Sequence, residues 1–358
     1  MFTPTIQMWT FTVERQLTKD LMLQVGYVGS QSYHTNLVED TNSPAPQVCQ
    51  NAQGCLSGGV LAPAQARMVP QGTTYFPSTP PIVVNGVTLA QRPNPYMSNN
   101  TAWVGEGTSS YHALNVSLVK RVTHGLAFKA NYSYSKVMDL NSAILAPSGE
   151  NEPADVFSPY NLALNRGPAA YSLHHQFNAN FSYQLPFGNG QRFGSGAGGF
   201  LNQLIGGWQW NGILNAQGGF PLTPLIGSNN SGTGDTNVSD VPNWNPDFKG
   251  PVVLKDPNQW FDPHAFTLPT AGTFGNVSRG SITGPGLVNV DTSLFKRFKV
   301  NERLNVQLRV EVFNILNHTN LFYPNDIVFA GSNYSQTAGQ ITAAAPSRQL
   351  QLALKLLF

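Results

Sequence analysis

Two cysteines offer the most definite chemistry in the sequence. Cys49 and Cys55 have five residues between them, and the segment that contains them, residues 47–55, is polar and can turn back on itself. In an oxidising compartment this arrangement favours a local disulfide. Free thiols are the alternative, and a metal site would need two further ligands that no neighbouring motif supplies. We therefore expect a disulfide between Cys49 and Cys55.

Other patterns that suggest chemistry are weak. The glycines of residues 194–199 match the GxGxxG spacing, but no strand–helix–strand unit surrounds them, so a flexible connection is expected. His174 and His175 are adjacent, would point opposite ways in a strand, and lack accompanying ligands. Residues 229–237 are rich in oxygen atoms but lack the EF-hand order, and we expect a mobile surface loop there. With no GxSxG motif or paired carboxylates, we expect no catalytic residue, no cofactor, no metal and no enzyme activity.

Composition favours strands and turns over helices. Charged residues make up only 11% of the chain, aromatics also 11%, and there are 34 glycines and 26 prolines. The net charge of +2 is small and Lys and Arg are scattered, so nucleic acid is not an expected partner. The mean hydropathy of -0.18 resembles that of a soluble protein. A membrane barrel is compatible with this average, because its strands expose apolar groups only at every second position.

Alternating apolar and polar residues predict nine strands. Residues 177–185 give the clearest case, with Phe177, Ala179, Phe181, Tyr183 and Leu185 on one face and polar residues between them. The expected strands cover residues 5–17, 21–30, 111–121, 126–135, 176–185, 208–218, 288–298, 304–312 and 350–358. This pattern predicts an all-β fold, an antiparallel transmembrane β-barrel portion with long extracellular loops.

The last strand carries the strongest membrane signal. One face holds Leu350, Leu352, Leu354, Leu356 and Phe358, whereas Gln349, Gln351 and Lys355 lie on the other. Such a strand suits a wall between lipid and water. We expect it to close the barrel and to act as the C-terminal signal for the barrel-assembly machinery.

A set of charged side chains falls on the faces that we expect to line the lumen. Solvation and pairing across strands are the expected roles, and direct contact with a substrate is the alternative. The set consists of Lys129, Asp291, Arg297, Arg309, Glu311 and Lys355.

Connection lengths predict the orientation in the membrane. Short connections follow strands one, three and seven, long ones follow strands two, four, six and eight, and the connection after strand five is intermediate. Short periplasmic turns and long extracellular loops put residue 358 in the periplasm and the start of the first strand outside. A complete barrel has an even strand number with both ends on one side, so nine strands indicate part of a larger barrel. The alternative is one missed strand, at Ile82–Leu89.

Several segments together resemble one family. Arg309–Asn320 is the longest of them, and the chain's ending, Arg348–Phe358, is another. The others are residues 14–17, 25–30, 206–213, 218–224, 260–266, 272–276, 279–286, 291–296 and 339–342. These segments resemble the C-terminal barrel of Oar-like TonB-dependent transporters, and the resemblance spans nearly the whole chain.

The resemblance implies a barrel of about 22 strands around a plug. Residues 1–358 would then be its C-terminal part, without a plug domain. The implied function is uptake of bulky nutrients such as glycans, peptides or metal chelates across the cell outer membrane. The implied partners are outer-membrane lipid, the barrel-assembly machinery, the TonB complex through a missing N-terminal region, and an unknown transported ligand. The alternative is a structural or adhesive surface protein whose long loops bind partners without transport.

Overall fold

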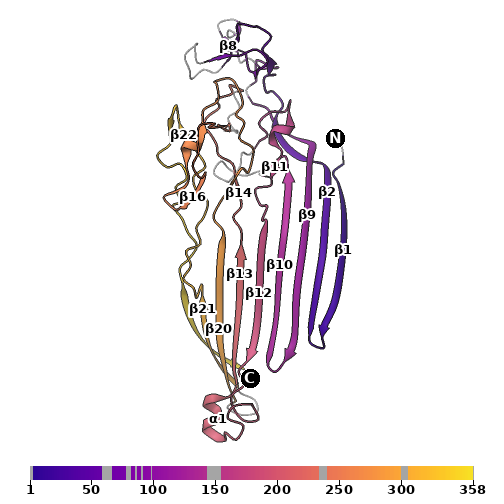
Figure 1. Cartoon of the computed structure of the whole chain (residues 1–358), viewed down its shortest axis with the longest axis vertical. Helices are drawn as coiled ribbons and strands as arrows, with labels where there is room; N and C mark the ends of the chain where they lie inside the picture. Colours follow the sequence, from indigo (N-terminus) through magenta and orange to yellow (C-terminus); the bar gives the residue numbers. More distant parts are fainter. Residues whose placement is uncertain are drawn as a thin grey trace.

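In the described part of the chain, nine long strands form one sheet (Figure 1). The computed structural model describes residues 3–58, 67–77, 82–84, 87–89, 92–97, 99–142, 155–233, 240–299 and 305–357. The nine strands are β1 (Thr5–Thr18), β2 (Leu21–Asp40), β9 (Thr101–Thr123), β10 (Leu126–Asp139), β12 (His175–Gln184), β13 (Trp208–Gln217), β20 (Leu287–Lys299), β21 (Asn305–Phe313) and β24 (Gln349–Leu357). Each predicted strand is present, and β2 and β9 extend well beyond their predicted ranges.

The strands follow chain order and every pair of neighbours is antiparallel. Two-residue turns join β1 to β2 and β9 to β10. In the second turn, His124 and Gly125 both have positive φ, 51° and 80°. This is the type I′ conformation, whose twist matches that of the flanking strands. The short turns therefore fix the register of the hairpins.

The register gives the sheet one apolar and one polar face. One apolar row runs across six strands through Val25, Val116, Tyr132, Phe177, Ala216 and Val288. The neighbouring row, displaced by one residue on every strand, runs through Gln24, Ser117, Asn131, Asn178, Asn215 and Asn289. Because successive side chains in a strand point to opposite faces, these two rows lie on opposite sides of the sheet.

Short elements fill the connections at the other end from the tight turns. They are β3 (Gln47–Val48), β4 (Cys55–Leu56), β5 (Met68–Val69), β6 (Thr74–Tyr75), β7 (Ile82–Val84), β8 (Val87–Leu89), η2 (Leu162–Asn165), β11 (Gly167–Pro168), β14 (Pro221–Leu222), β15 (Asn243–Trp244), β16 (Val253–Asp256), β17 (Gln259–Phe261), η3 (Pro263–Ala265), β18 (Phe266–Thr267), β19 (Ile282–Thr283), β22 (Phe329–Ala330) and β23 (Asn333–Tyr334). In the segment considered as a possible tenth spanning strand, β7 pairs with β8, and within the described residues neither strand joins the large sheet.

The main buried core lies in these long connections, which we call the cap. Phe261, Phe266, Ile226 and Val328 are almost fully buried there, packed with residues from the connections after β10, β13 and β21. The helix α1 (Gly199–Ile205) lies at the opposite end, in the connection between β12 and β13 (Figure 1). No helix in the described part of the chain is long and apolar enough to cross a membrane. The sheet thus separates a packed cap from an end of short turns.

Candidate functional site

A ladder of amide and hydroxyl side chains crosses three strands on the polar face. Ser117 Oγ donates to Asn131 Oδ1 at 2.8 Å, and Asn131 Nδ2 donates to Asn178 Oδ1 at 2.8 Å, which links β9, β10 and β12. Lys129 lies beside this ladder, and together with Ser117 and Asn131 it lines a depression of about 350 Å³. Hydrogen bonding between the ladder residues fixes their orientation, so the face presents ordered donors and acceptors.

Charged residues of the polar face continue across β20 and β21. Arg309 Nη2 donates to Glu311 Oε1 at 2.7 Å, and its guanidinium lies 4.5 Å from the ring centroid of Phe295. Asp291 accepts hydrogen bonds from Asn289 Nδ2 at 2.9 Å and from the backbone N–H of Asn314 at 2.8 Å. The Arg309–Glu311 pair lies within one strand, whereas the Arg309–Phe295 contact joins two neighbouring strands; pairing of the predicted charges across strands stays a prediction.

The remaining two predicted charges, Arg297 and Lys355, lie in one row across neighbouring strands, near the end of the sheet with the short turns. Arg297 and Lys355 are both opposite Gln307 in the register of β21, so a cationic side chain flanks that amide on either side. The register thus places all six predicted residues on the polar face. Their role in a lumen stays a prediction.

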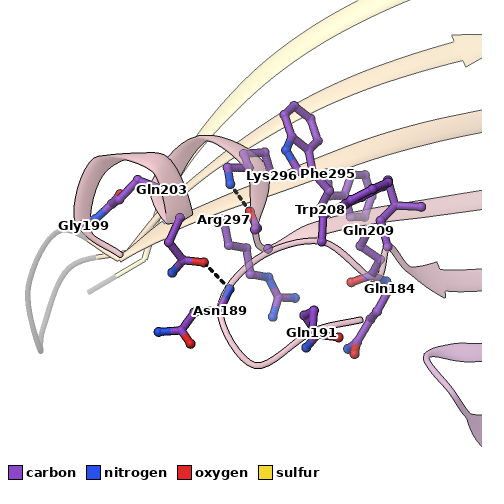
Figure 2. A pocket seen from close by; sticks show the side chains of 15 residues that line it. Gln184, Asn189, Gln191, Gly199, Gln203, Trp208, Gln209, Phe295, Lys296 and Arg297 are labelled. Atoms are coloured by element: carbon purple, nitrogen blue, oxygen red, sulfur yellow. Dashed lines mark hydrogen bonds between the residues drawn. The ribbon is translucent and has the colours of Figure 1, made fainter. Parts of the chain in front are cut away.

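Arg297 also lines a cavity of about 620 Å³ that the sequence did not predict (Figure 2). The cavity lies between the ends of the strands and the connection of residues 185–207, which includes α1. Its polar lining comes mainly from side-chain amides, those of Gln184, Asn189, Gln191, Asn202, Gln203 and Gln209. The sequence signal was this concentration of amides on both sides of the glycine-rich segment.

The apolar face bears the leucines of the last strand. Leu350, Leu352, Leu354 and Leu356 are 51–68% exposed and are opposite Val312, Val310, Leu308 and Val306. Phe358 lies outside the described residues. The leucines therefore extend a continuous apolar surface, whereas their role in barrel assembly stays a prediction.

Two buried ion pairs connect the cap to the ends of β2 and β10. Asp40, the last residue of β2, pairs with Arg92, whose Nη2 also donates to the carbonyl of Thr233 at 3.0 Å. Asp139, the last residue of β10, pairs with Arg279. All four of these ionic side chains are at least 93% buried. The cap is thus built onto specific strand ends by buried charges.

For the described residues 229–233, the structure corrects the expectation of a mobile surface loop. Ser231 is fully buried, and its backbone N–H donates to Asp240 Oδ2 at 2.6 Å. Asn230 Nδ2 donates to the carbonyl of Pro269 at 3.2 Å. The described part of this segment is therefore anchored in the cap, because its polar atoms have found partners there; residues 234–237 lie outside the described residues.

One buried carboxyl group in the cap is incompletely paired. Within the described part of the chain, Asp326 Oδ2 is buried and has no hydrogen-bond partner. Burial raises the pKa of Asp326 to about 7, because the charged form loses its hydration. The cap therefore contains a group that titrates near neutral pH.

The structure joins Cys49 and Cys55 in a disulfide, with Cα atoms 5.7 Å apart. The bond lies in the cap, where the pairings β3–β6 and β4–β5 surround it. Cys49 is buried and Cys55 packs against the same small core. The oxidised state of the protein in the cell stays a prediction.

An antiparallel sheet with one apolar and one polar face is typical of a membrane β-barrel. A family model described as "Outer membrane beta barrel domain" matches residues 1–351. The chain belongs to this family, which comprises outer-membrane barrels and not enzymes. It is an outer-membrane protein, and its apolar face is the surface that meets lipid.

Several solved structures are similar. The outer membrane transporter YddB from Escherichia coli matches 99% of this chain and 33% of its own length, at 10% identity and a TM-score of 0.47. The FrpB iron transporter from Neisseria meningitidis matches 99% of this chain and 31% of its own, at 12% identity and a TM-score of 0.38. The chain thus spans about a third of these proteins. No curated protein matches the sequence.

Proposed function

We propose that residues 1–358 form the C-terminal part of a TonB-dependent transporter barrel of the Oar-like kind, which takes up bulky nutrients such as glycans, peptides or metal chelates. The observation that carries the proposal is the single two-faced sheet whose outer edges are unpaired. Within the described residues, no strand pairs with the outer edge of β1 or with the outer edge of β24.

Unpaired edges have a direct consequence in a membrane. Hydrocarbon offers no hydrogen bonds, so each N–H and C=O of a spanning strand needs a partner strand. The edges of β1 and β24 therefore require further strands, supplied by additional chain or by another polypeptide. A larger barrel satisfies this requirement, and it leaves the amide ladder facing an interior wide enough for a plug.

The polar face supports a lumen rather than a second lipid contact. Asn131, Asn178 and the Arg309–Glu311 pair would be costly to place in hydrocarbon. Facing water or a plug domain, the same groups remain solvated. The proposed interior is therefore a hydrated, hydrogen-bonding wall, which suits passage of polar cargo.

The cap supports recognition of the cargo at the outer surface. Its hydrophobic core and buried ion pairs hold the long connections in one arrangement. A preorganised loop surface binds a ligand at a smaller entropic cost than a mobile one. The long loops thus provide the proposed ligand surface, while the strands provide a general wall.

The decisive experiment is to isolate the native gene product from outer membranes of its host. We expect mass spectrometry to find peptides of residues 1–358 in a larger polypeptide that also contains a plug, and photocrosslinking to recover TonB. A deletion strain should lose energy-dependent uptake of a nutrient that the complemented strain restores. A product limited to residues 1–358, inserted in the outer membrane and without TonB crosslinks, would instead support the structural or adhesive alternative.

A further inference from the structure

The connection between β12 and β13 contains a short amphipathic helix at the short-turn end of the sheet. On α1, Phe200, Leu201 and Leu204 are 79%, 54% and 50% exposed. Their spacing places them on one side of a helix. Asn202 and Gln203 instead line the amide-rich cavity (Figure 2). The helix therefore presents an uncovered apolar side and a polar side that is already in use.

Two residues of the apolar face attach this helix to the sheet. Trp208 Nε1 donates to the carbonyl of Leu204 at 2.9 Å. Lys296 Nζ donates to the carbonyl of Gly206 (Figure 2). Trp208 is opposite Lys296 in the register, and Lys296 is opposite Leu308. The ammonium group also lies 5.4 Å from the Trp208 ring centroid. The end of the helix is thus continuous with the row of side chains that bounds the lipid-facing surface.

The cavity side of the helix is held independently. Asn202 Oδ1 accepts a hydrogen bond from the backbone N–H of Asn189 at 2.7 Å, which ties α1 to the start of the same connection (Figure 2). The backbone N–H of Gly206 donates to the carbonyl of Asn202 at 2.9 Å. With both contacts formed, the helix cannot rotate to hide its leucines without breaking them. The apolar side is therefore a fixed feature of the surface.

The charge of the segment restricts what covers this surface. Residues 185–207 contain no Asp or Glu, and their only ionisable side chain is Arg192. The Arg192 guanidinium lies 5.5 Å from the ring centroid of Phe193, which is itself half-exposed. The segment thus combines exposed phenylalanine and leucine side chains with one cation, and it has no acidic group that would repel the headgroups of anionic lipid.

We propose that α1 and the nearby Phe193 form an interfacial anchor that lies in the phospholipid leaflet at the short-turn end of the sheet. Phe200, Leu201 and Leu204 enter the boundary between headgroups and acyl chains, and Arg192 remains among the phosphates. The anchor extends the lipid-facing surface of the sheet sideways at one leaflet. This inference concerns membrane contact and is independent of any transport function.

Paired spin labels on the two sides of α1 test the proposal. In a background with Cys49→Ser and Cys55→Ser, the native gene product that contains residues 1–358, with the strands that complete its sheet, would be labelled at Leu201→Cys or Gln203→Cys. It would then be inserted into vesicles of phosphatidylethanolamine and phosphatidylglycerol. Electron paramagnetic resonance then compares collisions with oxygen, which is enriched in hydrocarbon, and with a water-soluble nickel chelate. Leu204→Cys serves as a second position on the apolar side.

We expect the ratio of oxygen to nickel collisions to be several-fold higher at positions 201 and 204 than at position 203. Equal, high nickel collisions at all three positions would show a helix in water and overturn the proposal. Low collisions with both reagents at position 201 would show that protein covers the helix, and would also overturn it. Phe200→Ser, at a site that is 79% exposed, should lower the oxygen collisions at position 201 while leaving insertion of the sheet intact.

Discussion

Arg279 and Asp139 form an ion pair that is almost completely buried, although 139 residues lie between them in the chain. Asp139 ends β10, and Arg279 belongs to the long connection between β13 and β20. Arg279 also donates to the backbone carbonyls of Asn165, through Nε at 2.8 Å, and Gly167, through Nη2 at 3.2 Å. One guanidinium therefore joins two long connections to the end of a spanning strand.

Replacing Arg279 by Leu should destabilise the cap, because the Asp139 carboxylate would stay buried without its cation. The expected cost is about 3–5 kcal/mol, typical of breaking a buried pair from one side. Hydrogen exchange should accelerate in residues 155–170 and 220–228, while β12 and β13 remain protected. Arg348→Ala is the control, since that arginine is exposed, and it should leave the exchange unchanged. Unchanged protection in Arg279→Leu would contradict the anchoring role.

Charge placed on the two sides of β24 should have opposite consequences. Leu352→Arg puts a cation on the apolar face, and we expect insertion into lipid to become less favourable by about 2–4 kcal/mol. Gln351→Arg, one residue away on the polar face, should insert like the unmodified chain. Denaturant-dependent folding into vesicles of the native gene product that contains residues 1–358 measures both. Equal penalties for the two variants would refute the assignment of the faces.

The stability of the cap should fall as the pH rises from about 4 to 7. Asp326 has a pKa of about 7 in the folded chain and 3.8 as an ordinary aspartate, so the folded cap binds the proton more tightly. Its stabilising effect is complete below the lower pKa and is lost as the pH approaches the higher one. Hydrogen exchange of residues 322–340, corrected for the intrinsic rate, should report this loss. Asp326→Asn should remove the dependence; a variant with the same pH profile as the parent would exclude Asp326 as its source.

Cys49 and Cys55 should not react with iodoacetamide until a reductant is added. Because the disulfide closes a short loop, replacing both residues by Ser is expected to cost the surrounding part of the cap about 2 kcal/mol. Limited proteolysis near residues 47–58 should then become faster, whereas cleavage within the spanning sheet should not. Cys55→Ser alone should give one alkylated thiol after denaturation. Two reactive thiols in the unmodified chain would show that the disulfide is not formed.

The nine strands were predictable because a strand between lipid and water needs apolar and polar side chains at alternate positions. Phe177, Ala179 and Phe181 alternate with polar residues regardless of which strand lies beside them. The same alternation identified the charges of the polar face, from Lys129 to Lys355. A local pattern was sufficient, because each strand meets lipid on one side and water on the other.

The cap and the cavity were not predictable in the same way. Arg279 meets Asp139 only after two long connections have folded, and no local spacing encodes that contact. From the sequence, the leucines of α1 and the amides beside them are typical of an ordinary connection. The structure shows that they form a helix and a cavity wall at the ends of β12 and β13. By itself, the sequence determined which segments span the membrane and which side of each faces lipid, because those properties depend on neighbours one or two residues away. Only the tertiary structure decided which charges are buried together and which apolar groups stay uncovered, because these depend on contacts between segments far apart in the chain.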